Sequence, residues 1–281
     1  MTWYPPGPAL LFCPGDRPDR FTKALDRADA VVLDLEDAVA SVDKERARTE
    51  VARAALDPQR TIIRVSQTRS PGHADDLAAV RAGGYRCVML SKAESGDEIR
   101  QVAEMVDGDV LALVETPLGV VRANEIAEAE GCVGLMWGSE DLIAAMGGTA
   151  SRFAYLHAGP GQVPGAYRDV ARHARSVVAL AAAAYGRWAI DAVRLDIRDE
   201  GGLLAEARDA VALGFAGTAC IHPTQAAIIR RAYEPTEEQI DWARRVLAAG
   251  EAGERVVQVD GHMIDGPLFR QAEAILRRLP S

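Results

Sequence analysis

Residues 110–141 read VLALVETPLGVVRANEIAEAEGCVGLMWGSED, two short apolar runs with a helical stretch between them. The runs 110–114 and 133–137 are too short for helices and rich in Val and Leu, as is typical of strands buried on both faces of a parallel sheet. Residues 118–129 have helical spacing and are soon followed by Gly131, a residue type that is common just past helix ends. The stretch therefore predicts one strand–helix–strand unit of a parallel α/β fold.

The same alternation extends along most of the chain. Strands are expected at 9–13, 30–35, 61–65, 87–90, 110–114, 133–137, 189–195 and 217–221, and helices at 17–28, 44–56, 74–82, 97–106, 118–129, 166–185 and 203–213. Eight strands separated by helices fit a TIM (β/α)8 barrel, whose usual size is about 250 residues. An open doubly wound sheet is the alternative, although the first turn, CPGDRP, lacks the glycine pattern of a dinucleotide site.

The end of the chain is longer than a barrel needs. We expect a barrel domain over residues 1–235 and a C-terminal helical extension over 236–281. The extension contains a helical stretch at 236–249, the short apolar segment VVQVDGHMID at 256–265 and a second helix from Pro267. It could pack on its own barrel, but we expect it to pack on a neighbouring subunit.

Composition excludes several classes of protein. Of 281 residues 48% are hydrophobic and 26% are charged, the balance of an ordinary globular protein. No apolar run approaches the roughly 20 residues of a membrane helix. A net charge of −9 without a basic block argues against nucleic acid and anionic membranes as partners. The four cysteines form no CxxC pair and are expected to be reduced, which favours the cytoplasm.

Polar side chains gather where the expected strands end. In a parallel barrel, the carboxyl ends of the strands share one rim, and function resides there. Such a collection of acids with one Arg and one Lys is unfavourable unless a cation and an anionic ligand neutralise it. The rim residues are Asp34, Glu36, Asp37, Arg64, Lys92, Glu94, Glu115, Ser139, Glu140, Asp141 and His222.

Glu115 and Asp141 are the best candidates for a metal pair, because each follows its strand and the two strands are expected to be neighbours. Two carboxylates with waters and substrate oxygens are the usual ligands of Mg²⁺ in enzymes. Arg64 could hold a carboxylate or carbonyl oxygen with its planar guanidinium. The spacing leaves one alternative open, a salt-bridge network that joins Glu115, Asp141, Arg64 and Lys92 without any metal.

The order of the motifs resembles that of a known family. The segments LLFCPGDRPDRFTKAL, VVLDLEDAV, TIIRVS, VMLSKAES, LALVETPLGV, GLMWGSEDL, CIHPTQ and GHMIDGPLF are similar to those of the citrate lyase β-subunit-like branch of the HpcH/HpaI aldolase family. The resemblance covers nearly the whole chain. It implies a TIM barrel, Mg²⁺, a homotrimer or hexamer, and cleavage of a 3-hydroxyacyl thioester. One departure is Ser91, where the family often has Pro before the lysine.

The resemblance also implies roles for the rim residues. Glu115 and Asp141 match the magnesium ligands, and Arg64 matches the arginine that holds substrate oxygens. Asp37 and its neighbours resemble the residues that hold metal-bound water and this arginine.

Further roles follow for residues around the substrate. Gly138 and Ser139 lie where backbone groups line the carboxylate of the 2-oxo acid in the family. Asp265 resembles the acid/base aspartate that an adjacent subunit supplies. Arg17 and Lys23 correspond to a region that approaches the thioester or the phosphates of CoA.

The implied activity is that of a Mg²⁺-dependent carbon–carbon lyase. It would cleave a citramalyl-, malyl- or citryl-CoA type of thioester to an acetyl thioester and a 2-oxo acid such as oxaloacetate, pyruvate or glyoxylate. Three alternatives remain: the citryl-thioester lyase subunit of a multi-subunit citrate lyase, a non-catalytic subunit that docks an acyl carrier, and an aldolase of free hydroxy acids. Dependence on CoA and on Mg²⁺ separates them.

Overall fold

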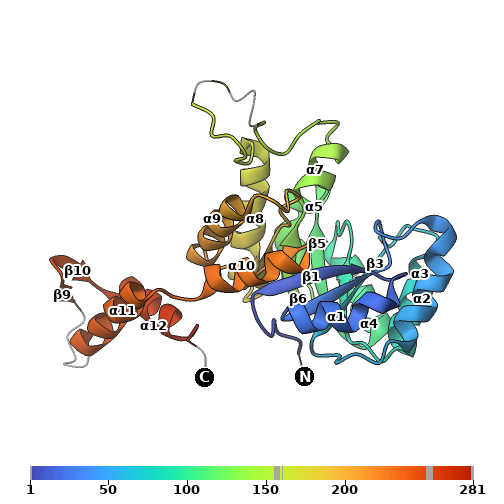
Figure 1. The fold of residues 1–281 in the computed structure, drawn as a ribbon, viewed down its shortest axis with the longest axis horizontal. Helices are drawn as coiled ribbons and strands as arrows, with labels where there is room; N and C mark the ends of the chain where they lie inside the picture. Colours follow the sequence, from blue (N-terminus) through green and yellow to red (C-terminus); the bar gives the residue numbers. More distant parts are fainter. Residues whose placement is uncertain (1, 155–158, 160, 251–255, 280–281) are drawn as a thin grey trace. The chain divides into compact units, whose positions relative to one another are not determined.

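The chain folds into two compact units, Met1–Ile229 and Arg230–Ser281. The structure is a computed structural model and describes residues 2–154, 159, 161–250 and 256–279 (Figure 1). The boundary between the units falls inside one helix, α10 (Pro223–Tyr233).

The first unit is a closed barrel of eight parallel strands, in which each strand pairs with the next and β1 pairs with β8. This confirms the predicted TIM barrel and excludes the open sheet. The strands are β1 (Ala9–Pro14), β2 (Ala30–Asp34), β3 (Thr61–Val65), β4 (Cys87–Leu90), β5 (Asp109–Val114), β6 (Cys132–Trp137), β7 (Trp188–Asp191) and β8 (Gly217–Cys220).

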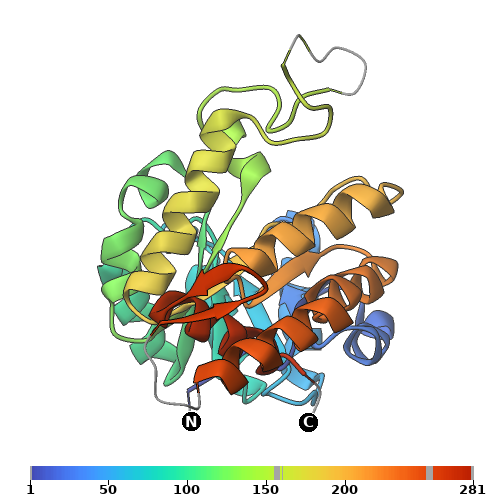
Figure 2. The same ribbon diagram turned by 90° about the vertical axis from the view of Figure 1, so that its left-hand side faces the viewer.

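Helices surround the barrel, as Figures 1 and 2 show. In Figure 2 the yellow helix α8 runs along the outside of the barrel, where it packs against β6 and β7. The helical elements between the strands are α1 (Pro18–Arg27), the 3-10 helix η1 (Ser41–Asp43), α2 (Lys44–Arg53), α3 (His73–Ala82), α4 (Gly96–Val106), α5 (Pro117–Val121), α6 (Ala123–Glu128), α7 (Ser139–Ala145), α8 (Asp169–Ala184) and α9 (Glu200–Ala212).

The inside of the barrel is filled with apolar side chains. Leu10, Val32, Ile62, Met89 and Leu111, one from each of five consecutive strands, belong to one buried cluster and have no measurable exposure. Removing such surface from water is the main stabilising contribution to the barrel. Because the interior is packed rather than open, ligands can be bound only at an end of the barrel, and the polar residues lie at the carboxyl end.

Several boundaries differ from the sequence-based prediction. The expected helix 118–129 is two helices, because the backbone leaves helical geometry at Arg122 (φ −102°, ψ 15°). Strand β7 ends at Asp191 rather than at residue 195, because its ladder with β8 ends at the pair Asp191–Thr218. Helices α7 and α10 were not expected. Each begins within a few residues of the end of a strand, α7 after β6 and α10 after β8.

The second unit has a small core of its own. Helix α11 (Glu237–Gly250), the antiparallel pair β9 (Val257–Val259) and β10 (His262–Ile264), and α12 (Gly266–Leu276) pack around a buried apolar cluster. Asp260 and Gly261 join the two strands with φ values of 51° and 79°, which a tight Asp-Gly hairpin turn requires. The apolar segment 256–265 is therefore a hairpin. No helix in the described ranges combines the length and apolarity needed to cross a membrane.

Candidate active site

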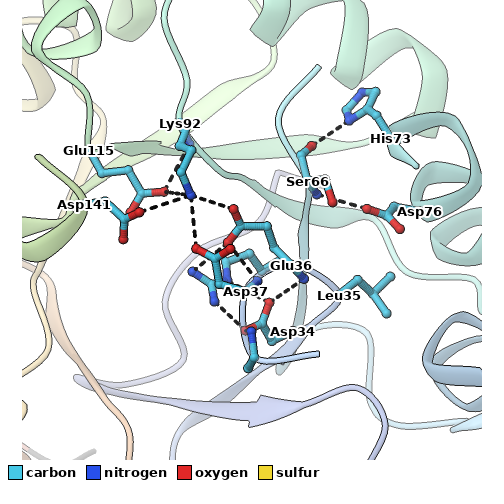
Figure 3. Close-up of polar contacts among 12 residues, drawn as sticks. Asp34, Leu35, Glu36, Asp37, Ser66, His73, Asp76, Lys92, Glu115 and Asp141 are labelled. Atoms are coloured by element: carbon cyan, nitrogen blue, oxygen red, sulfur yellow. Dashed lines mark hydrogen bonds and ion pairs between the residues drawn. The ribbon is translucent and has the colours of Figure 1, made fainter. Parts of the chain in front are cut away.

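The carboxyl rim of the barrel brings together side chains that are distant in sequence. Strand β2 ends at Asp34, which lies directly opposite Arg64 of β3 in the parallel ladder. Lys92 follows β4, Glu115 follows β5, and Asp141 lies in the first turn of α7, just after β6. Neighbouring strands of the barrel thus carry the acids and bases of one cluster (Figure 3).

Arg64 is held by two acids of the loop after β2. Its Nε donates to Asp34 Oδ1 at 2.8 Å, a second nitrogen donates to Asp34 Oδ2, and a third lies 3.4 Å from Glu36 Oε2. Its guanidinium also lies 5.0 Å from the centre of the Phe12 ring. Burial alone would lower the pKa of Arg64, but the hydrogen bonds and charge of Asp34 raise it above its ordinary value. Arg64 is therefore a fixed positive charge.

Asp34 also shapes the loop that carries the other acids. Its carboxylate accepts hydrogen bonds from the backbone N–H groups of Glu36, at 2.7 Å, and Ala38, at 3.2 Å. A short acidic side chain that satisfies nearby backbone donors is a common way to fix a tight turn. Asp34 therefore positions both Arg64 and Glu36.

A separate network fixes the end of β3. The Asp76 carboxylate, which is fully buried, accepts from the backbone N–H of Ser66 at 3.0 Å and from Arg48 Nε at 2.7 Å. The Nδ1 atom of the buried His73 lies 2.7 Å from the Ser66 carbonyl oxygen (Figure 3). These contacts anchor the backbone two residues beyond Arg64.

Lys92 lies at the centre of the acidic cluster. Its Nζ is 2.6 Å from Glu36 Oε1, 3.2 Å from Asp37 Oδ2, 3.2 Å from Asp141 Oδ1 and 3.8 Å from Glu115 Oε1. Its backbone adopts a left-handed conformation, with φ of 52°, which is uncommon for a residue other than glycine. Lys92 thus forms ion pairs with both candidate metal ligands, and Arg64 is connected to this network only through Glu36 among the described contacts.

The residue before this lysine is the departure noted in the sequence. Ser91 is fully buried, and its hydroxyl has no hydrogen-bond partner in the part of the chain that the structure describes. Lys92 nevertheless keeps its backbone N–H on Glu115 Oε1, at 3.2 Å. The serine therefore does not displace the lysine from the cluster.

Glu115 is the most strongly perturbed acid of the site. Its position is fixed because Thr116 caps α5 directly after it, accepting from the backbone N–H of Gly119 at 3.0 Å. Glu115 is 3% exposed. Burial and the neighbouring charge of Asp141 raise the pKa of Glu115 to about 8, against the opposing effects of Lys92 and Arg64. Two carboxylates with this mutual repulsion form a site that favours a cation.

The space beside Glu115 depends on Gly138. A Cβ atom at residue 138 would lie 2.7 Å from Glu115 Oε2, closer than real side chains approach. Glycine at this position thus leaves room for the side chain of Glu115. Over the described ranges, no group of three or more His, Cys, Asp or Glu residues is arranged to hold a metal. The donor set fits Mg²⁺ held by two carboxylates with waters and substrate oxygens as its other ligands.

A cavity of about 220 Å³ opens beside these acids. Its polar lining includes Arg64, Glu115 and Asp141. Its apolar lining comes from the ends of β5 and β6 and from the residues that follow β7 and β8: Leu113, Met136, Trp137, Val193 and Ile221. Gly138 and Ser139 also line it.

A second and larger cavity, of about 990 Å³, lies next to the first and shares Phe12 and Ile221 with it. Helix α1 contributes three basic residues to the lining of this cavity, and the segment where α10 begins contributes two polar residues. These residues are Arg20, Lys23, Arg27, His222 and Thr224, with one acid, Asp26.

The last two candidate residues from the sequence are Arg17 and Asp265. Arg17 does not line either cavity, and its Nε contacts Asp19 at 3.3 Å on the surface. Asp265 belongs to the second unit, at the N-terminus of α12, where its side chain makes no capping hydrogen bond. Asp37 is placed beside Lys92, whereas Asp34 and Glu36 hold Arg64.

Sequence analysis missed the residues that fix the apolar wall. Trp137 Nε1 donates to Asp191 Oδ1 at 2.7 Å, and Arg175 donates to both oxygens of Asp191. The Tyr167 ring packs edge-on against Trp137, with centroids 5.0 Å apart. No spacing rule links residues this far apart. The basic face of α1 could have been found, because 20, 23 and 27 are one helical stripe.

The chain is similar to known proteins of one family. A family model described as HpcH/HpaI aldolase/citrate lyase matches residues 9–223. The citrate lyase subunit beta-like protein of Mycobacterium tuberculosis is 51% identical over 272 residues, covering 97% of this chain and 95% of that protein. Citramalyl-CoA lyase, mitochondrial, of Homo sapiens is 30% identical, covering 96% of this chain and 84% of that protein.

Among solved structures, the protein CitE from Mycobacterium tuberculosis in complex with magnesium, acetoacetate and coenzyme A has a TM-score of 0.90 with this chain. The two are 50% identical, and the match covers 97% of each.

Fold and rim together define a TIM-barrel enzyme whose polar cluster lies at the carboxyl ends of the strands. The chain belongs to the HpcH/HpaI aldolase/citrate lyase family. The predicted citrate lyase β-subunit-like branch is confirmed, and the protein is a carbon–carbon lyase.

Proposed function

We propose that the protein cleaves a 3-hydroxyacyl-CoA thioester to acetyl-CoA and a 2-oxo acid with the help of Mg²⁺ held by Glu115 and Asp141. The observation that carries the proposal is the position of these two carboxylates. Both lie within 3.8 Å of the same ammonium group, and both line one cavity with Arg64. The similar protein CitE from Mycobacterium tuberculosis is in complex with magnesium, acetoacetate and coenzyme A, which supports Mg²⁺ as the metal and a CoA thioester as the substrate.

Cleavage requires three changes in the substrate. The hydroxyl group loses its proton, the bond between the second and third carbons breaks, and the electron pair passes to the thioester as an enolate. A bound Mg²⁺ would polarise the hydroxyl oxygen and neutralise the carboxylate of the acid half. The residues of this chain then have to hold the charges and protons that result.

Arg64 supplies a rigid positive charge next to the reacting oxygen. Because Asp34 fixes its guanidinium, no reorganisation is needed when negative charge develops on that oxygen. Asp37 is the most exposed of the four acids around Lys92, and Lys92 lowers its pKa against the effect of burial. Asp37 is therefore ionised at neutral pH, and we assign it to receive the hydroxyl proton directly or through water.

Asp265 completes the reaction in this proposal by protonating the enolate carbon. It lies in the second unit, on an N-terminal helix position where its carboxylate makes no capping hydrogen bond. We propose that the extension packs on a neighbouring subunit of a homotrimer or hexamer and delivers Asp265 to that subunit's rim. In the condensing direction the same carboxylate removes the proton.

The acid half of the substrate is proposed to carry a small uncharged substituent, as pyruvate does. The lining of the cavity that holds the acids also includes the apolar residues Leu113, Met136 and Val193. The cations of the cluster are already paired, because Asp34 and Glu36 hold Arg64 and four acids surround Lys92. Among the described residues that line this cavity, a second carboxylate, as in oxaloacetate, would meet only cations that are already paired, and its burial would be unfavourable.

The CoA half is assigned to the larger cavity. Its basic residues Arg20, Lys23 and Arg27 suit the phosphates of CoA, and its junction with the smaller cavity at Phe12 and Ile221 suits the thioester. All four cysteines are free and buried, which supports a reducing compartment such as the cytoplasm.

A panel of hydroxyacyl-CoA esters assayed with Mg²⁺ and with EDTA tests the proposal. Citramalyl-CoA is expected to be cleaved faster than citryl-CoA, and EDTA should abolish both activities. Cleavage of free citramalate at the same rate would support the aldolase of free hydroxy acids instead. Absence of turnover with every ester, together with absence of Mg²⁺ binding, would point to the non-catalytic docking subunit.

A further inference from the structure

Lys92 contacts four carboxylates with one ammonium group. The shortest contacts are to Glu36, at 2.6 Å, and to Asp37 and Asp141, at 3.2 Å each. The fourth, to Glu115, is 3.8 Å. Figure 3 shows the lysine between Glu115 and Asp141 on one side and the acids of the loop after β2 on the other.

Two of these four acids are the proposed metal ligands. A divalent cation bound by Glu115 and Asp141 approaches oxygens that the ammonium also approaches. Like charges at such short range repel strongly when they are partly removed from water, and Lys92 is mostly buried, with 21% of its side chain exposed. The ammonium therefore competes with any divalent cation for the same oxygens.

The other two acids offer the ammonium an alternative position. Glu36 is its closest partner, and Asp37 adds a second oxygen on the same side. An ammonium on a four-carbon stem can shift toward them by changing rotamer, which a guanidinium held in a fixed fork cannot do as readily. The site can thus accept a divalent cation while Lys92 remains paired.

We propose that Lys92 is a positioning residue that limits the affinity of the metal site: its ammonium competes with the divalent cation for Glu115 and Asp141. This inference rests on the proposed function, because it takes these two acids as the metal ligands. The lysine keeps the acidic rim neutralised and sets how tightly the metal is held. A role in merely holding Glu115 in place would need only the backbone N–H of Lys92, which the Met and Arg substitutions at this position retain.

Isothermal titration with MgCl₂ alone tests the proposal, using the full-length protein and no substrate. Lys92→Met removes the charge and keeps the length of the stem. Loss of the ammonium makes the electrostatic potential at Glu115 and Asp141 more negative. A divalent ion gains twice as much energy from this change as a singly charged proton does, so the Kd of Lys92→Met for Mg²⁺ is expected to fall by about tenfold or more. Lys92→Arg keeps the charge and is expected to show no such gain.

Lys23→Met is the matched control. It changes the net charge of the chain by the same amount, but Lys23 lies on α1 in the lining of the larger cavity. Its Kd for Mg²⁺ is expected to stay within about twofold of the wild-type value, because exposed charges at a distance are screened by salt.

A second variant covers the case in which Lys92→Met does not fold. Asp37 is 63% exposed, so Asp37→Asn leaves the fold intact and removes one of the alternative partners of the ammonium. The affinity of Asp37→Asn for Mg²⁺ is expected to be several-fold lower than that of the wild-type protein. Glu94→Gln removes an equal rim charge that makes no ion pair with Lys92 in the described contacts, and a smaller loss is expected.

The outcomes separate the two claims. If the wild-type protein binds Mg²⁺ and Lys92→Met binds it equally or more weakly, the role given to Lys92 is overturned and the metal assignment stands. If Asp37→Asn and Glu94→Gln lose the same affinity, competition through Lys92 is likewise overturned. If the wild-type protein binds no Mg²⁺ at all, the proposed function itself fails.

Discussion

Asp34 and Arg64 lie opposite one another at the ends of β2 and β3, and the Nε–Oδ1 distance between them is 2.8 Å. The same carboxylate accepts two backbone hydrogen bonds from the loop that follows. One side chain therefore fixes both the charge at the reacting oxygen and the loop that carries Glu36 and Asp37.

Replacing Asp34 with Ala should destabilise the protein strongly, because it leaves the buried Arg64 with only the longer contact to Glu36. Breaking a buried pair by removing one partner costs about 3–5 kcal/mol. The free energy of unfolding in urea should fall by about that amount. Asp75→Ala is the control, because Asp75 is exposed and its contact to Arg48 is 3.5 Å, and it should cost less than about 1 kcal/mol. Equal losses of stability in Asp34→Ala and Asp75→Ala would contradict the role of Asp34 as the partner of the buried Arg64.

The raised pKa of Glu115 predicts a pH dependence of stability in EDTA. Between its ordinary pKa of 4.5 and about 8, the folded protein retains a proton that the unfolded chain has released. Stability contributed by this group therefore falls as pH rises through that window. Glu115→Gln cannot titrate, so its advantage over the wild-type protein should grow between pH 5 and pH 8.5 in urea unfolding. If the difference in free energy of unfolding between Glu115→Gln and the wild-type protein stays constant with pH, the raised pKa of Glu115 is contradicted.

Asp191 is predicted to act on the acid cavity through Trp137. Asp191→Asn weakens the buried pair with Arg175 and the acceptor of the Trp137 indole, so both stability and the KM for the thioester should suffer. A several-fold rise in KM is expected. Asp209→Asn removes the exposed partner of the same arginine and leaves Trp137 untouched, so KM should not change. Steady-state kinetics of both variants check this, and parallel rises in KM would contradict it.

The basic face of α1 should matter for the CoA ester. Arg20→Met and Lys23→Met are each expected to raise the KM for the ester about tenfold, the effect of losing one charge-assisted contact. Arg17→Met should have little effect, because Arg17 lies outside the cavity. If Arg17→Met is the more harmful change, the placement of CoA in this cavity is wrong.

Asp265→Asn is expected to lower kcat by about 10²–10⁴-fold, the range for loss of a general acid. Its melting temperature should not change, because the carboxylate makes no capping bond. Asp260→Asn, in the turn of the hairpin that precedes Asp265, is the control and should leave kcat unchanged. Co-expression of Asp265→Asn with Glu115→Gln should restore part of the activity if one subunit supplies the aspartate to another. Failure of this complementation would place Asp265 on its own barrel or outside the reaction.

The fold was predictable because its signals are local. Strands such as Val110–Val114 of β5 are buried on both faces, so their sequences are continuous apolar runs. The convergence of Glu115 with Asp141 followed from topology alone, since parallel strands of a barrel end at one rim. The break at Arg122 was not predictable, because it is a small change of backbone angle within a pattern that remains helical.

Contacts between side chains required the structure. Sequence placed Asp34, Glu36 and Asp37 at the rim, but which of them holds Arg64 depends on the turn after β2. Likewise, nothing in the spacing joins Trp137 to Asp191, because they meet only across two neighbouring strands. The sequence identified the polar cluster but not the division of contacts within it.

Closure of the barrel by β1 and β8 has a consequence for the order of assembly during synthesis. The acids of the rim, together with Arg64 and Lys92, all lie before residue 142, so a ribosome has made every one of them when about half the chain is complete. The larger cavity takes part of its wall from residues 221–227, and β1 has no partner on one edge until residues 218–220 emerge. The polar cluster can therefore form early, whereas the wall of the larger cavity is completed last. A nascent chain that stalls before β8 leaves one edge of β1 unpaired, and such an edge promotes aggregation.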